Sequence, residues 1–167
     1  SIAEPSLLTA SVLEPENIPD FTFAGVYNNQ YIYYHAASLS WTDARAKAHA
    51  NNGDLVIIRN ADDNAYFTSV TTSVCWIGFY QDVNNPNYSE PFGGWKWIDG
   101  TSLSYSNWAA NEPNDGAPGG QDFGCFNYGG IGFWDDYHSP LPFIMAIDIN
   151  SMNSLSTSCH GENDGST

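Results

Sequence analysis

The stretch from Asn107 to Asp136 is rich in carboxylates and contains no lysine or arginine. Its acidic residues are Glu112, Asp115, Asp122, Asp135 and Asp136, and basic side chains are absent from Trp97 to the end of the chain. Carboxylates without a cationic side chain nearby either face water or hold a metal ion. Carboxylate and amide oxygens suit Ca²⁺, which takes about 6–8 oxygen ligands. The stretch is therefore a candidate calcium-binding region.

The whole chain is strongly acidic, with four basic and nineteen acidic side chains among 167 residues and a net charge of −15. This charge excludes a general nucleic-acid binder, because phosphate contacts need Lys and Arg. It also disfavours binding to an anionic membrane. No run of about 18 apolar residues exists that could span a membrane. The balance fits a secreted, cation-binding or salt-tolerant protein.

The three cysteines are Cys75, Cys125 and Cys159, an odd number that cannot pair completely within the chain. None has the spacing of a zinc site. A bridge between Cys75 and Cys125 and a pair of buried thiols are both open. Cys159 lies in a polar tail and is expected to belong to whatever follows.

The elements that must position the carboxylates alternate between short strands and two helices. We expect strands at 21–23, 31–34, 55–58, 74–80, 123–128 and 143–149, from their aromatic and β-branched residues. Helices are expected at 40–50 and 61–70, capped by Ser40 and Asn60. Residues 81–120 have no regular period, and long irregular regions inside a domain are usually functional. The predicted fold class is α+β: two helices, short antiparallel sheets and a long irregular ligand-binding loop region.

The predicted organisation is one central domain with two flanking segments. Residues 1–20 are expected to form a linker or arm, 21–150 the domain, and 151–167 a C-terminal linker with the start of a following repeat. One domain of about 100–150 residues fits the length of the chain.

Short motifs follow one another along this domain in a fixed order. They lie at 39–44, 53–57, 76–78, 95–100, 107–108, 112–114, 134–136 and 142–144. Each motif alone is weak, but the series resembles the C-type lectin-like domain over about residues 21–149. The resemblance implies that family's fold.

In that family a Glu-Pro-Asn motif and a later Trp-Asn-Asp motif hold the principal calcium ion. The resemblance therefore implies metal ligands at Glu112, Asn114, Gln121, Asp135 and Asp136, and a cis Glu112–Pro113 bond. Gln121 stands where the family has a glutamate, and Asp122 is the alternative if the register differs by one. Asp135 replaces an asparagine, so the formal charge of the site is unchanged.

The same resemblance implies calcium-dependent binding of sugars with vicinal equatorial hydroxyls, as in mannose, glucose, N-acetylglucosamine and fucose. The implied sugar ligands are Glu112, Asn114, Gln121 and Asp135. Because Asp135 accepts hydrogen bonds and cannot donate them as asparagine does, the pattern offered to a sugar differs from the family's. A further implication is a second calcium ion at Asp82, Asp115 and Asp122.

Two features suggest the context. Ala48 and Met145 stand in place of two of the family's cysteines, which resembles bacterial versions more than animal ones. The tail at 159–166 resembles the opening of repeats in giant bacterial surface adhesins. We therefore expect an extracellular, monomeric module of a multi-domain adhesin that binds glycans, with no nucleic acid partner and no membrane insertion. The alternative is a calcium-stabilised domain that binds a protein or ice surface. No Ser/His/Asp or Cys/His arrangement favours an enzyme.

Overall fold

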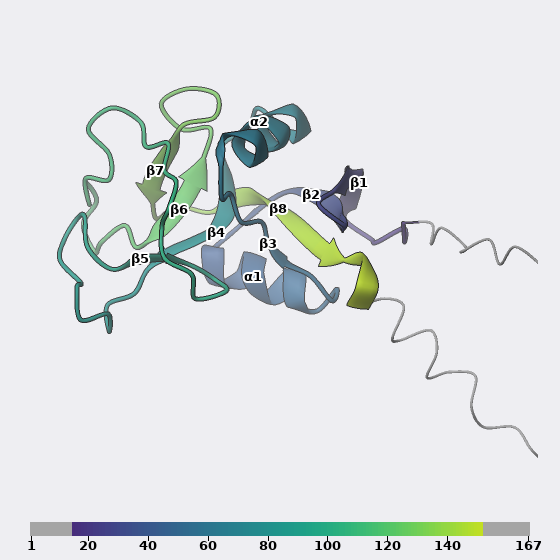
Figure 1. Ribbon diagram of the computed structural model, residues 1–167, viewed down its shortest axis with the longest axis horizontal. Coiled ribbons are helices and arrows are strands. Elements are labelled where there is room, and N and C mark those ends of the chain that lie inside the picture. The colour runs from purple at the N-terminus through teal and green to yellow at the C-terminus, as the bar shows by residue number, and fades with distance from the viewer. Residues whose placement is uncertain (1–14, 152–167) are drawn as a thin grey trace, which may run out of the picture.

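Two helices flank an eight-stranded sheet in the computed structural model, which describes residues 15–151 (Figure 1). The helices are α1 (Trp41–His49) and α2 (Ala61–Val70). The strands are β1 (Phe21–Tyr27), β2 (Gln30–Leu39), β3 (Asp54–Leu55), β4 (Cys75–Gln81), β5 (Trp95–Trp97), β6 (Phe123–Phe126), β7 (Trp134–Tyr137) and β8 (Leu141–Asp148). This arrangement confirms the α+β class.

The sheet is mixed, which corrects the expectation of short antiparallel sheets. Its strands follow the order β1-β2-β8-β4-β6-β7, with β3 on β8 and β5 on β4. All pairs are antiparallel except β4 and β8, which run parallel where Trp76 lies opposite Phe143. The pairing of β2 with β8 brings the two ends of the domain together, and the long loops lie at the opposite end (Figure 1).

Both helices begin where the sequence predicts. The Ser40 side chain accepts a hydrogen bond from the Asp43 N–H, and the Asn60 side chain accepts one from the Asp63 N–H, which satisfies N–H groups that a helix leaves free. Helix α1 is tied to the sheet by Trp41, whose indole N–H donates to the Ile77 carbonyl at 2.8 Å.

Three strand predictions need correction. The strand expected at 55–58 is only β3, because Val56 leaves β8 after one bond to Ile144 and its carbonyl then accepts from Gly78. Strands β5 and β7 were not predicted. Aspartate is rare in strands, yet β7 forms because Trp134 is fully buried and lies opposite Phe126 on β6.

The sheet register explains the state of the cysteines. Cys75 lies opposite Phe126 and shares its core cluster, whereas Cys125 lies opposite Trp76 in the other cluster. Since successive side chains of a strand point to opposite faces, the two thiols face opposite sides of the sheet. Both are free and buried, and burial raises the pKa of each. The bridge is thus excluded; Cys159 lies outside the described residues.

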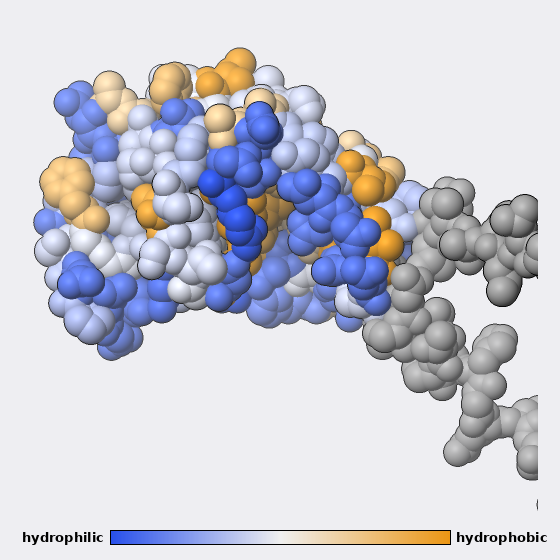
Figure 2. All heavy atoms as spheres, viewed as in Figure 1, coloured by the Kyte–Doolittle hydropathy of each residue, from blue (hydrophilic) through white to orange (hydrophobic). Residues whose placement is uncertain are grey.

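Apolar packing replaces the cysteines that the resemblance led us to look for. Ala48 and Met145 are both fully buried, in the same cluster. No helix within residues 15–151 is long and apolar enough to cross a membrane. The face shown in Figure 2 is mostly hydrophilic, with hydrophobic side chains scattered in small groups.

Candidate metal and ligand site

Three separate segments bring acidic and amide side chains together at the edge of the sheet. Glu112 and Asn114 lie in the loop between β5 and β6, on either side of Pro113, and the Glu112–Pro113 bond is cis. Gln121 lies just before β6. Asp135 and Asp136 lie on β7, the outermost strand on this side. The antiparallel pairing of β6 and β7 therefore places these segments together.

Asp136 holds the loop in place. It is 1% exposed, and its two carboxylate oxygens accept hydrogen bonds from the N–H groups of Asn114 (2.9 Å) and Asp115 (2.6 Å). Its backbone carbonyl accepts a bond from the Gln121 side-chain amide at 2.8 Å. These bonds connect β7 to both loop segments. An ionised carboxylate has about four lone-pair sites, so its oxygens keep capacity for a further partner.

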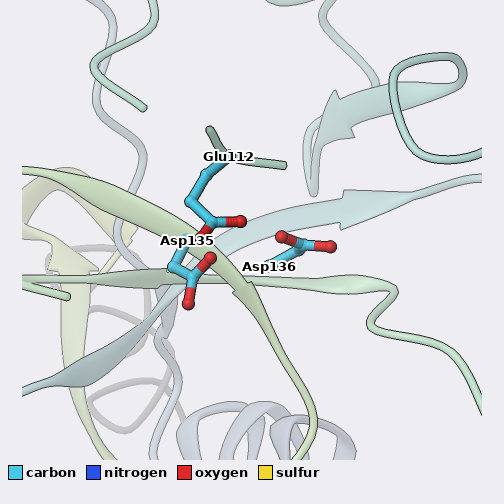
Figure 3. A group of neighbouring side chains, drawn as sticks. All are labelled: Glu112, Asp135 and Asp136. Carbon is cyan, nitrogen blue, oxygen red and sulfur yellow. The ribbon is translucent and has the colours of Figure 1, made fainter. Parts of the chain in front are cut away.

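The carboxyl groups of Glu112, Asp135 and Asp136 face one another (Figure 3), with one oxygen of each within 4.8 Å of the others. Glu112 Oε2 and Asp135 Oδ1 are buried and have no hydrogen-bond partner in the protein. Buried polar groups are nearly always satisfied, and an exception calls for an explanation such as an ion. Two unpaired carboxylate oxygens beside a third carboxylate fit a divalent cation that takes oxygen ligands.

The electrostatics of the group lead to the same assignment. Burial raises the pKa of Asp135 to about 8, and the adjacent Glu112 carboxyl adds to the rise. Burial also raises the pKa of Glu112. No lysine or arginine follows Lys96 in the sequence, and the five ion pairs of the described residues all lie elsewhere. A bound cation would supply the missing positive charge.

Gln121, and not Asp122, lies at the cavity beside these carboxyl groups. Gln121 is 8% exposed and lines the cavity, whereas the Asp122 carboxylate lies near Gly120. Because the Gln121 nitrogen donates to Asp136, its oxygen is free to face the cavity. A side chain on Gly116 would lie 2.4 Å from Asn114 Oδ1 and 3.4 Å from Gln121 Oε1, so the absence of a side chain there leaves room for both oxygens.

The residues expected for a second calcium ion are less closely grouped. Asp82 makes a 2.6 Å ion pair with Lys96. The carboxylates of Asp115 and Asp122 both lie near Gly120, and Asp115 Oδ1 accepts a bond from the Gln121 N–H at 2.8 Å. Burial and the charges of Glu90 and Asp115 raise the pKa of Asp122. Within residues 15–151, Glu112, Asp135 and Asp136 form the only group of three such ligands.

The cavity itself is open and has a volume of about 360 Å³. Its lining consists of Glu112, Asn114, Gly116, Ala117, Gln121, Tyr128, Asp135, Tyr137 and His138. The sequence analysis missed the aromatic members. Tyr128 lies just after β6 and Tyr137 at the end of β7, and the two rings meet because these strands form a hairpin. The sequence analysis did not predict β7, so it could not pair the two rings.

Helix α2 supports the site from behind. The buried Asn64 side chain accepts a bond from the Trp134 indole N–H (2.8 Å) and donates to the Gly132 carbonyl (3.0 Å). Asn127 is also buried; it accepts from the Gly132 N–H and donates to the carbonyls of Thr71 and Ser73. These bonds hold the β6–β7 loop and the strand that carries Asp135.

Comparison with known proteins gives a consistent result. The sequence model of the family described as "Lectin C-type domain" matches residues 37–141. C-type mannose receptor 2 of Mus musculus is 28% identical over 119 residues, covering 68% of this chain and 7% of the receptor. The type-2 ice-structuring protein of Brachyopsis segaliensis is 26% identical over 90 residues, covering 54% of this chain and 49% of that protein. The chain thus spans a small part of the receptor and about half of the ice-structuring protein.

Solved structures share the fold. The carbohydrate-recognition domain of the human scavenger receptor C-type lectin has a TM-score of 0.63 and 24% identity, covering 80% of this chain and 99% of that one. A calcium-independent type II antifreeze protein has a TM-score of 0.62 and 22% identity, covering 80% and 95%. These similarities show the fold. The role of Glu112, Asp135 and Asp136, here called the carboxyl group cluster, has to be argued from the chemistry of these side chains.

Proposed function

The chain belongs to the lectin C-type domain family, and we propose on this premise that it is a calcium-dependent carbohydrate-binding module. The observation that carries the proposal is the pair of buried, unpartnered oxygens of Glu112 and Asp135 beside Asp136. Without an ion, each unpaired buried carboxyl oxygen would destabilise the fold by about 1–3 kcal/mol, and nothing would offset this cost.

The proposed calcium ligands are Glu112, Asn114, Gln121, Asp135 and Asp136. Four of them line the cavity, and Asp136 lies behind them and fixes the loop. A bound calcium ion would supply open coordination positions for two adjacent hydroxyl groups. The protein's part is to hold the oxygens in one place, which the Asp136 hydrogen bonds to the Asn114 and Asp115 N–H groups accomplish.

The proposed sugar ligands are Glu112, Asn114, Gln121 and Asp135. Ionised carboxylates only accept, and the Gln121 nitrogen already donates to Asp136. The site therefore offers mainly acceptors, so sugar hydroxyl groups would act as donors and Asn114 as the main side-chain donor. We propose sugars with vicinal equatorial hydroxyls as the ligand class, of the mannose, glucose, N-acetylglucosamine or fucose type.

The wider setting remains part of the proposal. We infer an extracellular or cell-surface module, monomeric within a larger adhesin, in which repeated copies would raise a weak single-site affinity through avidity. The two named relatives are animal proteins; the proposal of a bacterial origin rests on the replaced cysteines and on the sequence of the tail. The tail that suggests an adhesin repeat lies outside the described residues.

Thermal melting with calcium and with chelator tests the ion. An ion that binds only the native state must stabilise it by RT ln(1 + [L]/Kd), about 2.7 kcal/mol at 100-fold excess over Kd. Magnesium at equal concentration serves as a control, because it demands octahedral geometry and keeps several waters. A glycan array with and without calcium then tests the sugar. An unchanged melting temperature would refute calcium binding.

A second candidate is binding to ice or a protein surface, favoured by the similarity to an ice-structuring protein. Such a role needs a contiguous flat face. Among residues 15–151, the exposed large hydrophobic residues come from three segments of the chain: Phe23 and Val26 on β1, Val83, Tyr88 and Phe92 before β5, and Tyr128, Ile131 and Phe133 between β6 and β7. Ice recrystallisation assays would favour this candidate if growth stops in chelator.

A further inference from the structure

The cavity beside Glu112, Asp135 and Asp136 is also lined by aromatic side chains. Tyr128, Tyr137 and His138 line it together with Glu112 and Asp135. The rings of Tyr128 and Tyr137 are 5.4 Å apart, and those of Tyr137 and His138 are 5.6 Å apart. We call these three side chains the aromatic strip. One cavity is therefore lined both by oxygen ligands and by three neighbouring rings.

The core holds only part of this strip. Tyr137 contacts Trp76, with ring centroids 6.1 Å apart, so its position is fixed from below. Tyr128 is 39% exposed and His138 is exposed as well. Tyrosine and histidine rings on a rigid strand end offer apolar contact area at low entropic cost, since each has only two side-chain torsions.

The size of the cavity leaves room beyond an ion. Its volume is about 360 Å³, whereas one water molecule takes up about 30 Å³ in the liquid. Pockets for small molecules span about 300–1,000 Å³. An ion and the sugar edge that it holds would fill only part of this volume. The aromatic strip would then be within reach of the group attached to that sugar, because it lines the same cavity.

We propose, on the basis of the proposed sugar function, that the aromatic strip is a stacking subsite for the group attached to the ion-bound sugar. The ligand class is a glycoside whose neighbouring group has a flat apolar face, as in the ring of the next sugar or an aryl aglycone. The occupant is determined by continuity, because the strip and the oxygen ligands line one cavity. The negative charge of the carboxylates around the cavity disfavours an anionic substituent, which agrees with an uncharged apolar group.

Matched glycosides test this inference. Calorimetry on the calcium-loaded protein would compare the methyl and p-nitrophenyl α-glycosides of mannose, glucose, N-acetylglucosamine and fucose. An aromatic pair contributes about 0.5–1.5 kcal/mol beyond burial, so we expect the aryl glycoside to bind about 2- to 12-fold more tightly. Tyr137→Ala and His138→Ala should reduce this preference while leaving methyl-glycoside affinity within about 2-fold. Tyr137→Phe, which keeps the ring, should retain it.

Phe133→Ala is the matched control, because Phe133 is an exposed ring (43%) in the same hairpin that does not line the cavity. The calcium-induced rise in melting temperature in every variant verifies an intact ion site. Equal affinity for both glycosides, or an aryl preference that survives Tyr128→Ala, Tyr137→Ala and His138→Ala, overturns the stacking subsite alone. Failure of all eight glycosides to bind in calcium overturns the sugar function and the subsite with it.

Discussion

Replacing Asp135 by asparagine separates two effects of the buried carboxyl group: its destabilisation of the calcium-free fold and its contribution to calcium binding. Asp135 is 4% exposed, lacks a partner for Oδ1, and has a pKa raised from 3.8 to about 8. Without an ion, the folded protein must keep this group protonated at pH 7. Over the 3.2 units from 3.8 to pH 7, at about 1.36 kcal/mol per unit, this costs at most about 4 kcal/mol.

We expect Asp135→Asn to stabilise the calcium-free protein by about 1–3 kcal/mol, because local relaxation reduces the bound above. At about 2–4 °C per kcal/mol, the melting temperature should rise by about 2–12 °C. Calcium should then stabilise the variant less, because two carboxylates remain instead of three and affinity follows ligand charge. A 10- to 100-fold weaker affinity removes about 1.4–2.7 kcal/mol of ion-induced stability.

The assay is differential scanning calorimetry in chelator and in excess calcium. Asp148→Asn is the control for net charge, because Asp148 is exposed and an asparagine oxygen can still accept from the Asn150 N–H. The double variant Gln121→Glu/Asp135→Asn restores the charge with the family's own arrangement and should regain the calcium response. The reasoning is refuted if Asp135→Asn lowers the melting temperature in chelator and responds to calcium like the parent.

Three further predictions concern pH, the cavity and its support. The folded state binds a proton at Asp135 more tightly than the unfolded chain does, so protonation of Asp135 stabilises the fold at low pH, and this stabilisation is lost as pH rises through about 8. The melting temperature in chelator should therefore fall from pH 6 to 9. The fall should be smaller in Asp135→Asn. Gly116→Ala should weaken calcium binding at least about 10-fold by calorimetry, because the added carbon would meet Asn114 Oδ1 at 2.4 Å; unchanged affinity would show that Asn114 is no ligand. Asn64→Ala should cost about 1–3 kcal/mol in denaturant unfolding, because the buried Trp134 N–H loses its acceptor; exposed Ser69→Ala is the control, and equal effects would contradict this role.

Local chemistry made some parts of the fold predictable. The helix starts follow from Ser40 and Asn60, whose side chains bond N–H groups three residues on. The buried strands β4 and β8 follow from continuous apolar runs. The short strand β7 does not, because its two aspartates are unfavourable in isolation and only pairing with β6 makes the segment extended.

The candidate site likewise has parts that the sequence predicted and parts that it left open. Residue type alone identified an acidic, cation-free segment, and the order of motifs pointed to Glu112, Asn114, Gln121, Asp135 and Asp136 as ligands. Those identifications rest on charge and oxygen chemistry, which do not depend on the path of the chain. The register of Gln121 against Asp122 stayed open, because a shift of one residue changes which side chain faces the cavity.

The amino-acid sequence by itself determined the set of oxygen ligands proposed for the ion, the helix boundaries and the family, since these depend on side-chain type and on contacts within a few residues. Only the tertiary structure decided the parallel contact of β4 with β8, the opposite directions of Cys75 and Cys125, and the aromatic strip beside the carboxyl groups. Each of these depends on which strands become neighbours. That choice is made by the burial of residues far apart in the chain, which no local pattern records.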